Sequence, residues 1–283
     1  MKLQERGARL SGLLSPVRSS IRHPLATLAS FVQKTLVIAE MEMRKLRHDP
    51  TELATRAVQP ALWLLVFGQV LNRTRAFPTG NLSYLAFMTP GILAQSVLFI
   101  SIFYGIAVIW ERDLGILHKF LASPTPRTAL VTGKALAAGV RALTQAVFIY
   151  LLALALGVEI NGNPLALAGV LLVVLLAAAL FSTFSLIIAC WVKTRERFMG
   201  IGQVLTMPLF FASSAIYPIS IMPHWLQLLS YINPLTYTVD ALRALMVVGG
   251  NDAYGLAFDL AILISVTAIL ILFGARLYPT IVT

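Results

Sequence analysis

The sequence predicts an all-α membrane protein with six transmembrane helices. Hydrophobic residues make up 58% of the 283 residues and charged residues only 12%, and the mean hydropathy is +0.82. A soluble domain of this size could not bury so much apolar surface in one core, whereas a protein in lipid does not need to bury it. The apolar residues also gather in six runs, and basic residues gather in alternate connections between them.

Each apolar run is expected to be a helix, because a segment that crosses lipid must satisfy its backbone hydrogen bonds internally. The runs are continuous and lack the alternation, over segments of about 10 residues, that marks a membrane β-barrel. The expected spans are 55–71, 83–109, 128–157, 164–191, 198–221 and 256–275.

The distribution of Lys and Arg predicts that both termini are cytoplasmic. With the N-terminus inside, 18 of the 22 basic residues fall on the inner side, three (Arg73, Arg75 and Arg243) fall outside, and Arg141 lies within the third span. Inner loops of membrane proteins carry such an excess of positive charge. We therefore attribute the net charge of +10 to topology and to contact with anionic membrane lipid. No nucleic-acid partner is expected.

The segments that flank the spans differ in character. Residues 1–30 are polar and basic without the apolar core of a signal peptide, so we expect a cytoplasmic tail, with a second short tail at 277–283. Residues 31–48 have an apolar stripe and a basic face, and Pro50 ends the pattern. This pattern favours an N-terminal interfacial helix at the inner face of the bilayer, the alternative being a helix packed on a cytosolic partner.

Two connections have compositions that an ordinary loop would not need. The inner loop 111–127 is densely charged and holds leucines at helical spacing, which suits either a docking helix for another protein or a solvated loop that fixes orientation. The outer loop after the fifth span is long and apolar, so we expect two short helices that dip into the outer leaflet. On the second of these, Asp240 and Arg243 are expected to pair with each other.

The chemistry of an ATPase or a metalloenzyme is missing from the sequence. Its Gly133-Lys134 pair is followed by Ala135, so a P-loop would lack the hydroxyl that binds Mg²⁺. The four histidines are scattered without metal-ligand spacing. We therefore expect no enzyme activity, no metal and no cofactor bound by this chain. The single Cys190 cannot form an intrachain disulfide.

The spans contain few ionisable residues, which disfavours an ion-coupled transporter. A pathway between spans would then be apolar with neutral polar groups, suited to an amphiphilic substrate such as a drug, a lipid or a lipid-linked glycan. The alternative is that these groups only mediate helix packing. The candidates are Gln95, Tyr104, Gln203, Thr206 and Ser213.

Two motifs resemble those of a known family. The run 233–237 (Asn-Pro-Leu-Thr-Tyr) with the later Arg243, and the loop from Glu111 to Arg127, resemble the ABC-2 type ABC transporter permeases, most closely the drug-resistance and nodulation-factor export branch. The resemblance covers residues 31–276, which would form one ABC-2 type transmembrane domain. Many members carry Thr and Glu where this chain has Ile116 and His118.

The resemblance implies a permease dimer, made with a second copy or a sibling permease, in the cell membrane. A separate P-loop ATPase subunit would bind ATP and Mg²⁺, and the inner loop would be the cytoplasmic coupling helix that contacts it. The outer loop would be a re-entrant helical hairpin, with Pro234, Tyr237, Asp240 and Arg243 as its motif. The implied coupling residues are Glu111, Arg112, Asp113, Gly115, Leu117 and Pro124, with Arg44 and Arg47 as secondary candidates. The alternatives are an ion-coupled secondary transporter and a non-transporting membrane assembly factor.

Overall fold

The computed structural model describes residues 50–74, 77–80, 82–115, 127–192 and 194–278, together with single residues at 33, 37, 40 and 44. This part of the chain is all-helical, as predicted. Outside the helices, its one strand-like pairing is an isolated antiparallel bridge between Ile160 and Val247.

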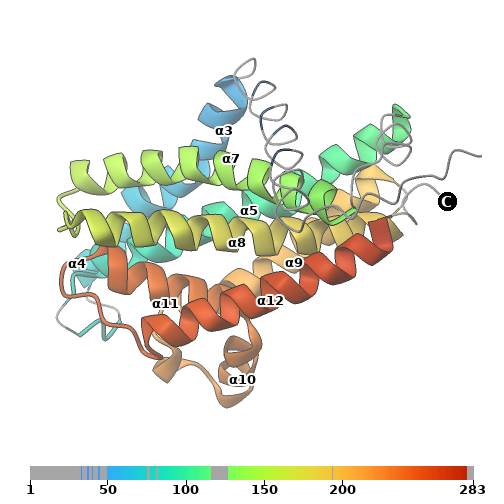
Figure 1. The fold of residues 1–283 in the computed structure, drawn as a ribbon. Helices are drawn as coiled ribbons and strands as arrows, with labels where there is room; N and C mark the ends of the chain where they lie inside the picture. The colour runs from blue at the N-terminus through green and yellow to red at the C-terminus, as the bar shows by residue number, and fades with distance from the viewer. Residues whose placement is uncertain are drawn as a thin grey trace, which may run out of the picture.

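Four helices are long and apolar enough to cross a membrane, namely α5 (Tyr84–Asp113), α7 (Arg127–Ala155), α8 (Pro164–Trp191) and α12 (Leu256–Leu277). Figure 1 shows them running along the length of one bundle. They coincide within a few residues with the second, third, fourth and sixth predicted spans. Each of these predictions rested on a continuous apolar run, the strongest signal that a membrane helix offers.

The first predicted span lies within three helical pieces that follow one another without a gap. These are α3 (Pro50–Leu62), the π-helix η1 (Trp63–Gly68) and α4 (Gln69–Thr74). Pro60 lies inside α3 and has no N–H group, so the helix loses one regular hydrogen bond shortly before the π-helical segment begins.

The prediction for the fifth span was wrong at its C-terminal end. Helix α9 (Arg195–Phe211) stops ten residues before the expected boundary at 221, and a turn and the short 3₁₀ helix η2 (Ile219–Ile221) follow. The carbonyl groups where α9 ends accept hydrogen bonds from side chains far along the chain. Asn233 donates to the carbonyls of Leu209 and Ala212. Arg243 donates to the Ser214 carbonyl, and Tyr84 donates to the Ile216 carbonyl.

Two short helices occupy the apolar outer loop, as expected. They are α10 (His224–Ile232) and α11 (Pro234–Met246). Helix α10 leaves large apolar side chains exposed, including Trp225 and Ile232, whereas most of α11 is buried. Helix α11 packs against α5, α8 and α12.

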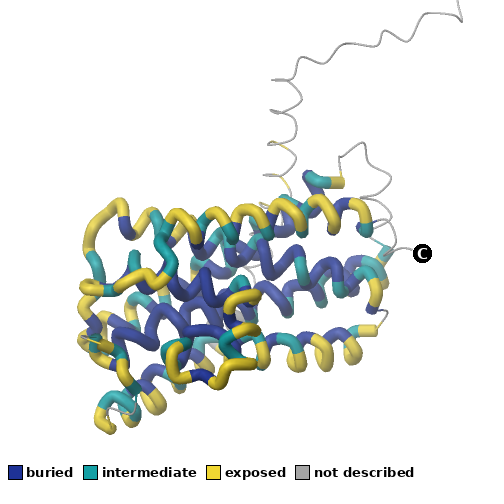
Figure 2. Tube along the Cα trace, turned by 90° about the horizontal axis from the view of Figure 1, so that it is seen from below, coloured by how far each residue is buried: buried dark blue, intermediate teal, exposed yellow. Residues whose placement is uncertain are grey.

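Helix α5 lies at the centre of the bundle. It packs against α7, α8, α9 and α11, and the buried residues in Figure 2 run through the middle of the molecule. Glycines on α5 permit two of these close approaches. A Cβ atom added at Gly91 would lie 2.6 Å from the Ala215 Cα, and one added at Gly105 would lie 2.6 Å from the Phe198 ring.

The chain direction gives the bundle two distinct ends. At one end, α5, α8 and α12 finish and α7 and α9 begin, and we call this the charged end. At the other, α5, α8 and α12 begin and the segment 212–255 is gathered; we call this the pocket end.

Several predictions fall outside the described residues: the tail at 1–30, most of the interfacial helix at 31–48, residues 279–283, and the coupling candidates Arg47, Leu117 and Pro124.

Candidate functional site

A buried ion pair joins α5 to α7 at the charged end. The Lys134 Nζ atom donates to the Glu111 Oε2 atom at 2.5 Å, and the two residues are only 3% and 4% exposed. Glu111 is one of the coupling residues that the resemblance implies, and its side chain faces the interior of the bundle. From the sequence, Lys134 is interpreted as an inner-side charge and as part of an incomplete P-loop, and not as a partner of Glu111. Its place within an otherwise apolar part of the third span is the signal that could have identified it.

Asp113 joins the same end of α5 to α9. Its carboxylate accepts hydrogen bonds from Arg112 at 3.2 Å and from Arg195 at 2.9 Å. The Arg195 guanidinium also lies 3.4 Å from the centre of the Trp110 ring, a cation–π contact. These side chains are partly exposed. The sequence motif included Arg112 and Asp113, whereas Arg195 lies 82 positions further along the chain and could not be linked to them.

The chain leaves this cluster through a glycine turn. Gly115 has a φ of +69°, a conformation in which a larger residue would strain the backbone. The segment 116–126 lies beyond it, outside the described residues. Of the secondary candidates, Arg44 is exposed and pairs with Glu40 at 2.7 Å, one helical turn away.

The end of α12 reaches the same region. Tyr278 is fully buried in a small cluster with Val108, Leu130 and Leu186. Side-chain contacts therefore join α5, α7, α8, α9 and α12 where the inner loop begins. A displacement of that loop would act on all five helices together.

The structure does not gather the five candidate pathway residues into one channel. Thr206 and Ser213 donate their hydroxyl groups to carbonyls of the preceding turn, which fits the packing alternative, and Gln203 is exposed. The Arg141 guanidinium lies over the Tyr104 ring, 5.2 Å from the centre of that ring. Gln95 lines a separate polar cavity of about 250 Å³, together with residues of α3 and α7.

The motif of the outer loop fixes the α10–α11 hairpin to α9. The Asn233 Oδ1 atom accepts from the Leu235 N–H at 3.0 Å and caps α11, with Pro234 in its first turn. Its Nδ2 atom donates to the carbonyls of Leu209 and Ala212. The Tyr237 hydroxyl donates to the Tyr231 carbonyl at 2.6 Å. Each of these motif residues therefore has a local structural task.

The expected pair between Asp240 and Arg243 does not form. The Asp240 Oδ2 atom accepts from the backbone N–H groups of Ala253 and Tyr254, so it orders the segment before α12. The Arg243 Nη2 atom donates to the carbonyls of Ser214 and Phe87, and the guanidinium stacks on the Phe87 ring at 3.9 Å. Burial lowers the pKa of Arg243 to about 10, against an opposing effect of Asp240, so the side chain stays charged at neutral pH.

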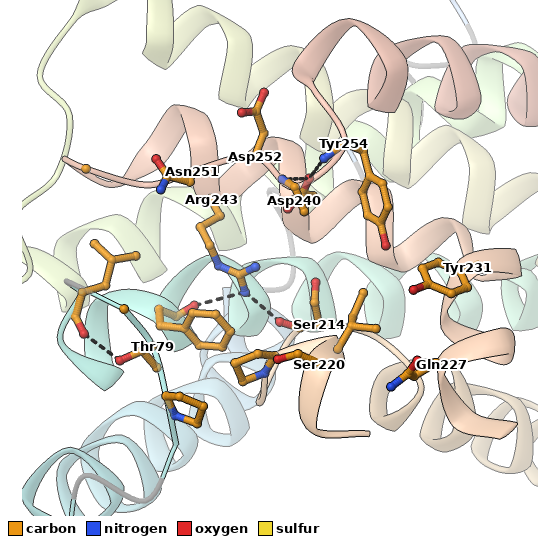
Figure 3. A pocket seen from close by; sticks show the side chains of 18 residues that line it. Thr79, Ser214, Ser220, Gln227, Tyr231, Asp240, Arg243, Asn251, Asp252 and Tyr254 are labelled. Carbon is orange, nitrogen blue, oxygen red and sulfur yellow. Dashed lines mark hydrogen bonds between the residues drawn. The ribbon is translucent and has the colours of Figure 1, made fainter. Parts of the chain in front are cut away.

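A pocket of about 670 Å³ opens beside Arg243 at the pocket end. Figure 3 shows the Arg243 guanidinium near the centre, with Tyr231, Tyr254 and Gln227 on one side. The lining comes from several places in the chain: residues 78–80 and 82, one residue of α5, the turn after α9, helices α10 and α11, and the segment 249–254. This pocket could not be predicted from the sequence, because its walls meet only through tertiary packing.

Comparison with known proteins identifies the class. The family model of the ABC-2 type transporters matches residues 33–247, and the chain belongs to this family. The predicted membership is confirmed, and the chain is accordingly an integral membrane permease of an ABC transporter.

Relatives over most of the chain carry transport names. The transport permease ycf38 of Cyanophora paradoxa is 31% identical over 87% of this chain and 83% of its own. The daunorubicin resistance ABC transporter permease protein DrrB1 of Streptomyces coeruleorubidus is 26% identical over 84% of this chain and 82% of its own. The inner membrane transport permease YadH of Escherichia coli K12 is 22% identical over 68% of this chain and 73% of its own.

Proposed function

We propose that this chain is the membrane subunit of an exporter that moves an amphiphilic substrate outward, powered by a separate ATPase subunit. The observation that carries the proposal is the cluster of contacts among five helices where the inner loop leaves α5. Family membership gives the class of transporter. Through this cluster, a movement of a cytoplasmic partner would be transmitted to the helices of the bundle. ATP and Mg²⁺ would be bound by the partner.

The proposed membrane arrangement has six spans, both termini in the cytoplasm, and the charged end facing inward. The continuous helical segment 50–74 and α9 would supply the two spans beyond the four long helices. The excess of Lys and Arg at the charged end supports this direction. Helices α10 and α11 would form the re-entrant hairpin in the outer leaflet, which the exposed apolar face of α10 favours.

The proposed assembly is a permease dimer, of two copies or of this chain with a sibling, bound to two ATPase subunits in the cell membrane. Large apolar side chains remain exposed on α3, α7, α9 and α12, so the bundle has apolar surface for both lipid and a second permease. Daunorubicin is the drug named for one relative, which supports a drug-like amphiphile among the possible substrates.

The proposal is tested by purifying the tagged chain from its native membranes in mild detergent and identifying proteins that co-purify at near-equal amounts. We expect a P-loop ATPase whose activity changes when it is bound to the permease. Replacing Asp113 with Asn should weaken the coupling of that ATPase to transport without loss of membrane insertion. Unaltered coupling in Asp113→Asn would contradict a role for the α5–α9 contact, and absence of an ATPase partner would contradict the proposed function.

A further inference from the structure

The pocket at the pocket end contains a buried positive charge without a carboxylate partner. Arg243 is only 6% exposed, yet it takes part in none of the ion pairs among the described residues. Its Nη2 atom bonds to two carbonyls, and its Nε atom has no partner. Buried charges in proteins are normally paired, so the guanidinium has capacity for an anionic ligand.

A second donor lies beside it. Ser214, on the turn after α9, lines the same pocket and is 6% exposed, and its hydroxyl has no hydrogen-bond partner in the described part of the chain. Figure 3 shows Ser214 next to the Arg243 guanidinium. A guanidinium with a neighbouring hydroxyl suits the oxygens of a phosphate or a carboxylate, because hydrogen bonds to ionised acceptors are the strong ones.

Negative charge and aromatic rings lie on another part of the same wall. Asp240 and Asp252 line the pocket; both N–H bonds to Asp240 go to Oδ2, and its Oδ1 atom accepts none from the described residues. Asp259, in the first turn of α12, is fully buried, and neither of its carboxylate oxygens has a hydrogen-bond partner among the described residues. The rings of Tyr231 and Tyr254 meet edge to face at 6.4 Å and also line the pocket.

Carboxylates and aromatic faces together are the groups that bind an ammonium ion. A purely anionic ligand would be attracted by one arginine but repelled by at least two carboxylates. A ligand with both charges can satisfy both parts of the wall. The volume of about 670 Å³ lies in the usual range for small-molecule sites.

We propose that this pocket binds a zwitterionic headgroup, with its phosphate or carboxylate on Arg243 and Ser214 and its ammonium group on Asp240 and Asp252 beside Tyr254. The ligand chemistry can come from the headgroup of an amphiphile in the membrane or from a free zwitterion in solution. The site is separate from the charged end, and its binding needs neither ATP nor an ATPase partner.

The test is a titration of the purified full-length chain in detergent, followed by calorimetry, without nucleotide. Four probes are compared: short-chain phosphatidylethanolamine, short-chain phosphatidylglycerol, free phosphoethanolamine and inorganic phosphate. Phosphatidylethanolamine is expected to bind at least tenfold more tightly than phosphatidylglycerol. Tight binding of phosphoethanolamine would identify a free zwitterion as a sufficient ligand, whereas weak binding would identify the amphiphile as the source.

Two variants test the binding of the anionic group and of the ammonium group of the ligand, and neither removes a hydrogen bond seen within the described residues. Ser214→Ala removes a hydroxyl that has no hydrogen-bond partner among the described residues, and Ser213→Ala is its matched control, because the Ser213 hydroxyl bonds to the preceding turn instead. Asp252→Asn removes the charge and keeps an oxygen that can still accept from the Leu256 N–H. A hydrogen bond to a charged group is worth about tenfold in affinity. We expect losses of about that size for phosphatidylethanolamine in Ser214→Ala and Asp252→Asn, and no loss in Ser213→Ala.

Three results would overturn the proposal. Equal binding of phosphatidylglycerol, unaffected by Asp252→Asn, would mean that only an anion is recognised. Binding of phosphatidylethanolamine that neither variant weakens would place the ligand elsewhere. Absence of binding by every probe, in a chain whose thermal unfolding is normal, would mean that Arg243 serves only to hold the turn after α9.

Discussion

The two ends of the bundle use charge in opposite ways. At the charged end, Glu111 and Asp113 have cationic partners within the protein, Lys134 and Arg195. At the pocket end, Arg243 bonds to backbone carbonyls, and Asp240 accepts from backbone N–H groups. At the charged end, each of these two carboxylates thus has a cationic side chain as partner, which suits a rigid link between helices. The pocket end keeps charge available, which suits a ligand.

The first prediction tests the buried ion pair between α5 and α7 by removing one of its two partners. Glu111→Ala should destabilise the folded chain by about 3–5 kcal/mol, since Lys134 would be left buried without its partner. Thermal unfolding in detergent measures the effect. The exposed Glu196→Gln is the control and should change little. If the double replacement Glu111→Leu with Lys134→Met is as unstable as the single variant, the pair is not the cause.

The second prediction concerns the close approach of α5 to the turn after α9. Gly91→Ala should cost about 1–3 kcal/mol or more, because the new methyl group meets backbone atoms of Ala215, which cannot rotate away. The matched control is Gly200→Ala on α9, where no atom of the described residues lies within 4 Å of the added Cβ. That control should be neutral or stabilising by about 0.5–1 kcal/mol. Equal stability of the two variants would show that the turn does not lie against α5.

The third prediction separates the cap of α11 from the bonds that hold it to α9. Asn233→Asp keeps the oxygen that caps α11 but loses the donor to Leu209 and Ala212. It should destabilise the pocket end by about 1–3 kcal/mol, because carbonyls are left unsatisfied and face a carboxylate. Limited proteolysis within 212–232 measures this local loosening. Proteolysis that increases equally at the charged end would instead indicate a global loss of stability.

The smallest expected effect on stability is at the exposed pair. Asp113→Asn should change the free energy of unfolding by less than about 1 kcal/mol, because partly exposed ion pairs contribute little. Its effect on coupling, proposed above, should exceed its effect on stability. A large loss of stability would mean that Asp113 acts as a structural residue like Glu111.

The sequence was sufficient for features that depend on local runs and insufficient for those that depend on tertiary contacts. The apolar run 164–191 predicted α8 to the residue, because hydrophobic length alone defines such a helix. The end of α9 could not be predicted, because Asn233 binds the Leu209 and Ala212 carbonyls from 21 to 24 residues away, and Arg243 binds the Ser214 carbonyl in the following turn from 29 residues away. The expected Asp240–Arg243 pair was wrong for the same reason. Helical spacing places the two side chains near each other, but tertiary partners take their hydrogen-bonding atoms.

The candidate site shows the same division. Glu111, Asp113 and Gly115 could be selected from a local motif. The partners of the two acids, Lys134 for Glu111 and Arg195 for Asp113, belong to other helices. The motif also could not show that Glu111 faces inward and Asp113 outward. Their positions two residues apart on a helix place them on different faces.

The central claim is that a P-loop ATPase binds at the charged end and not at the pocket end. The most direct measurement is site-specific photocrosslinking in native membranes, with a photoreactive residue at Leu114, which is 66% exposed beside the cluster, and in a second sample at Trp225, which is 63% exposed on α10. We expect a crosslink from position 114 to a P-loop ATPase and none from position 225. A crosslink to the ATPase from position 225, or none from position 114 in a complex that still contains the ATPase, would contradict it.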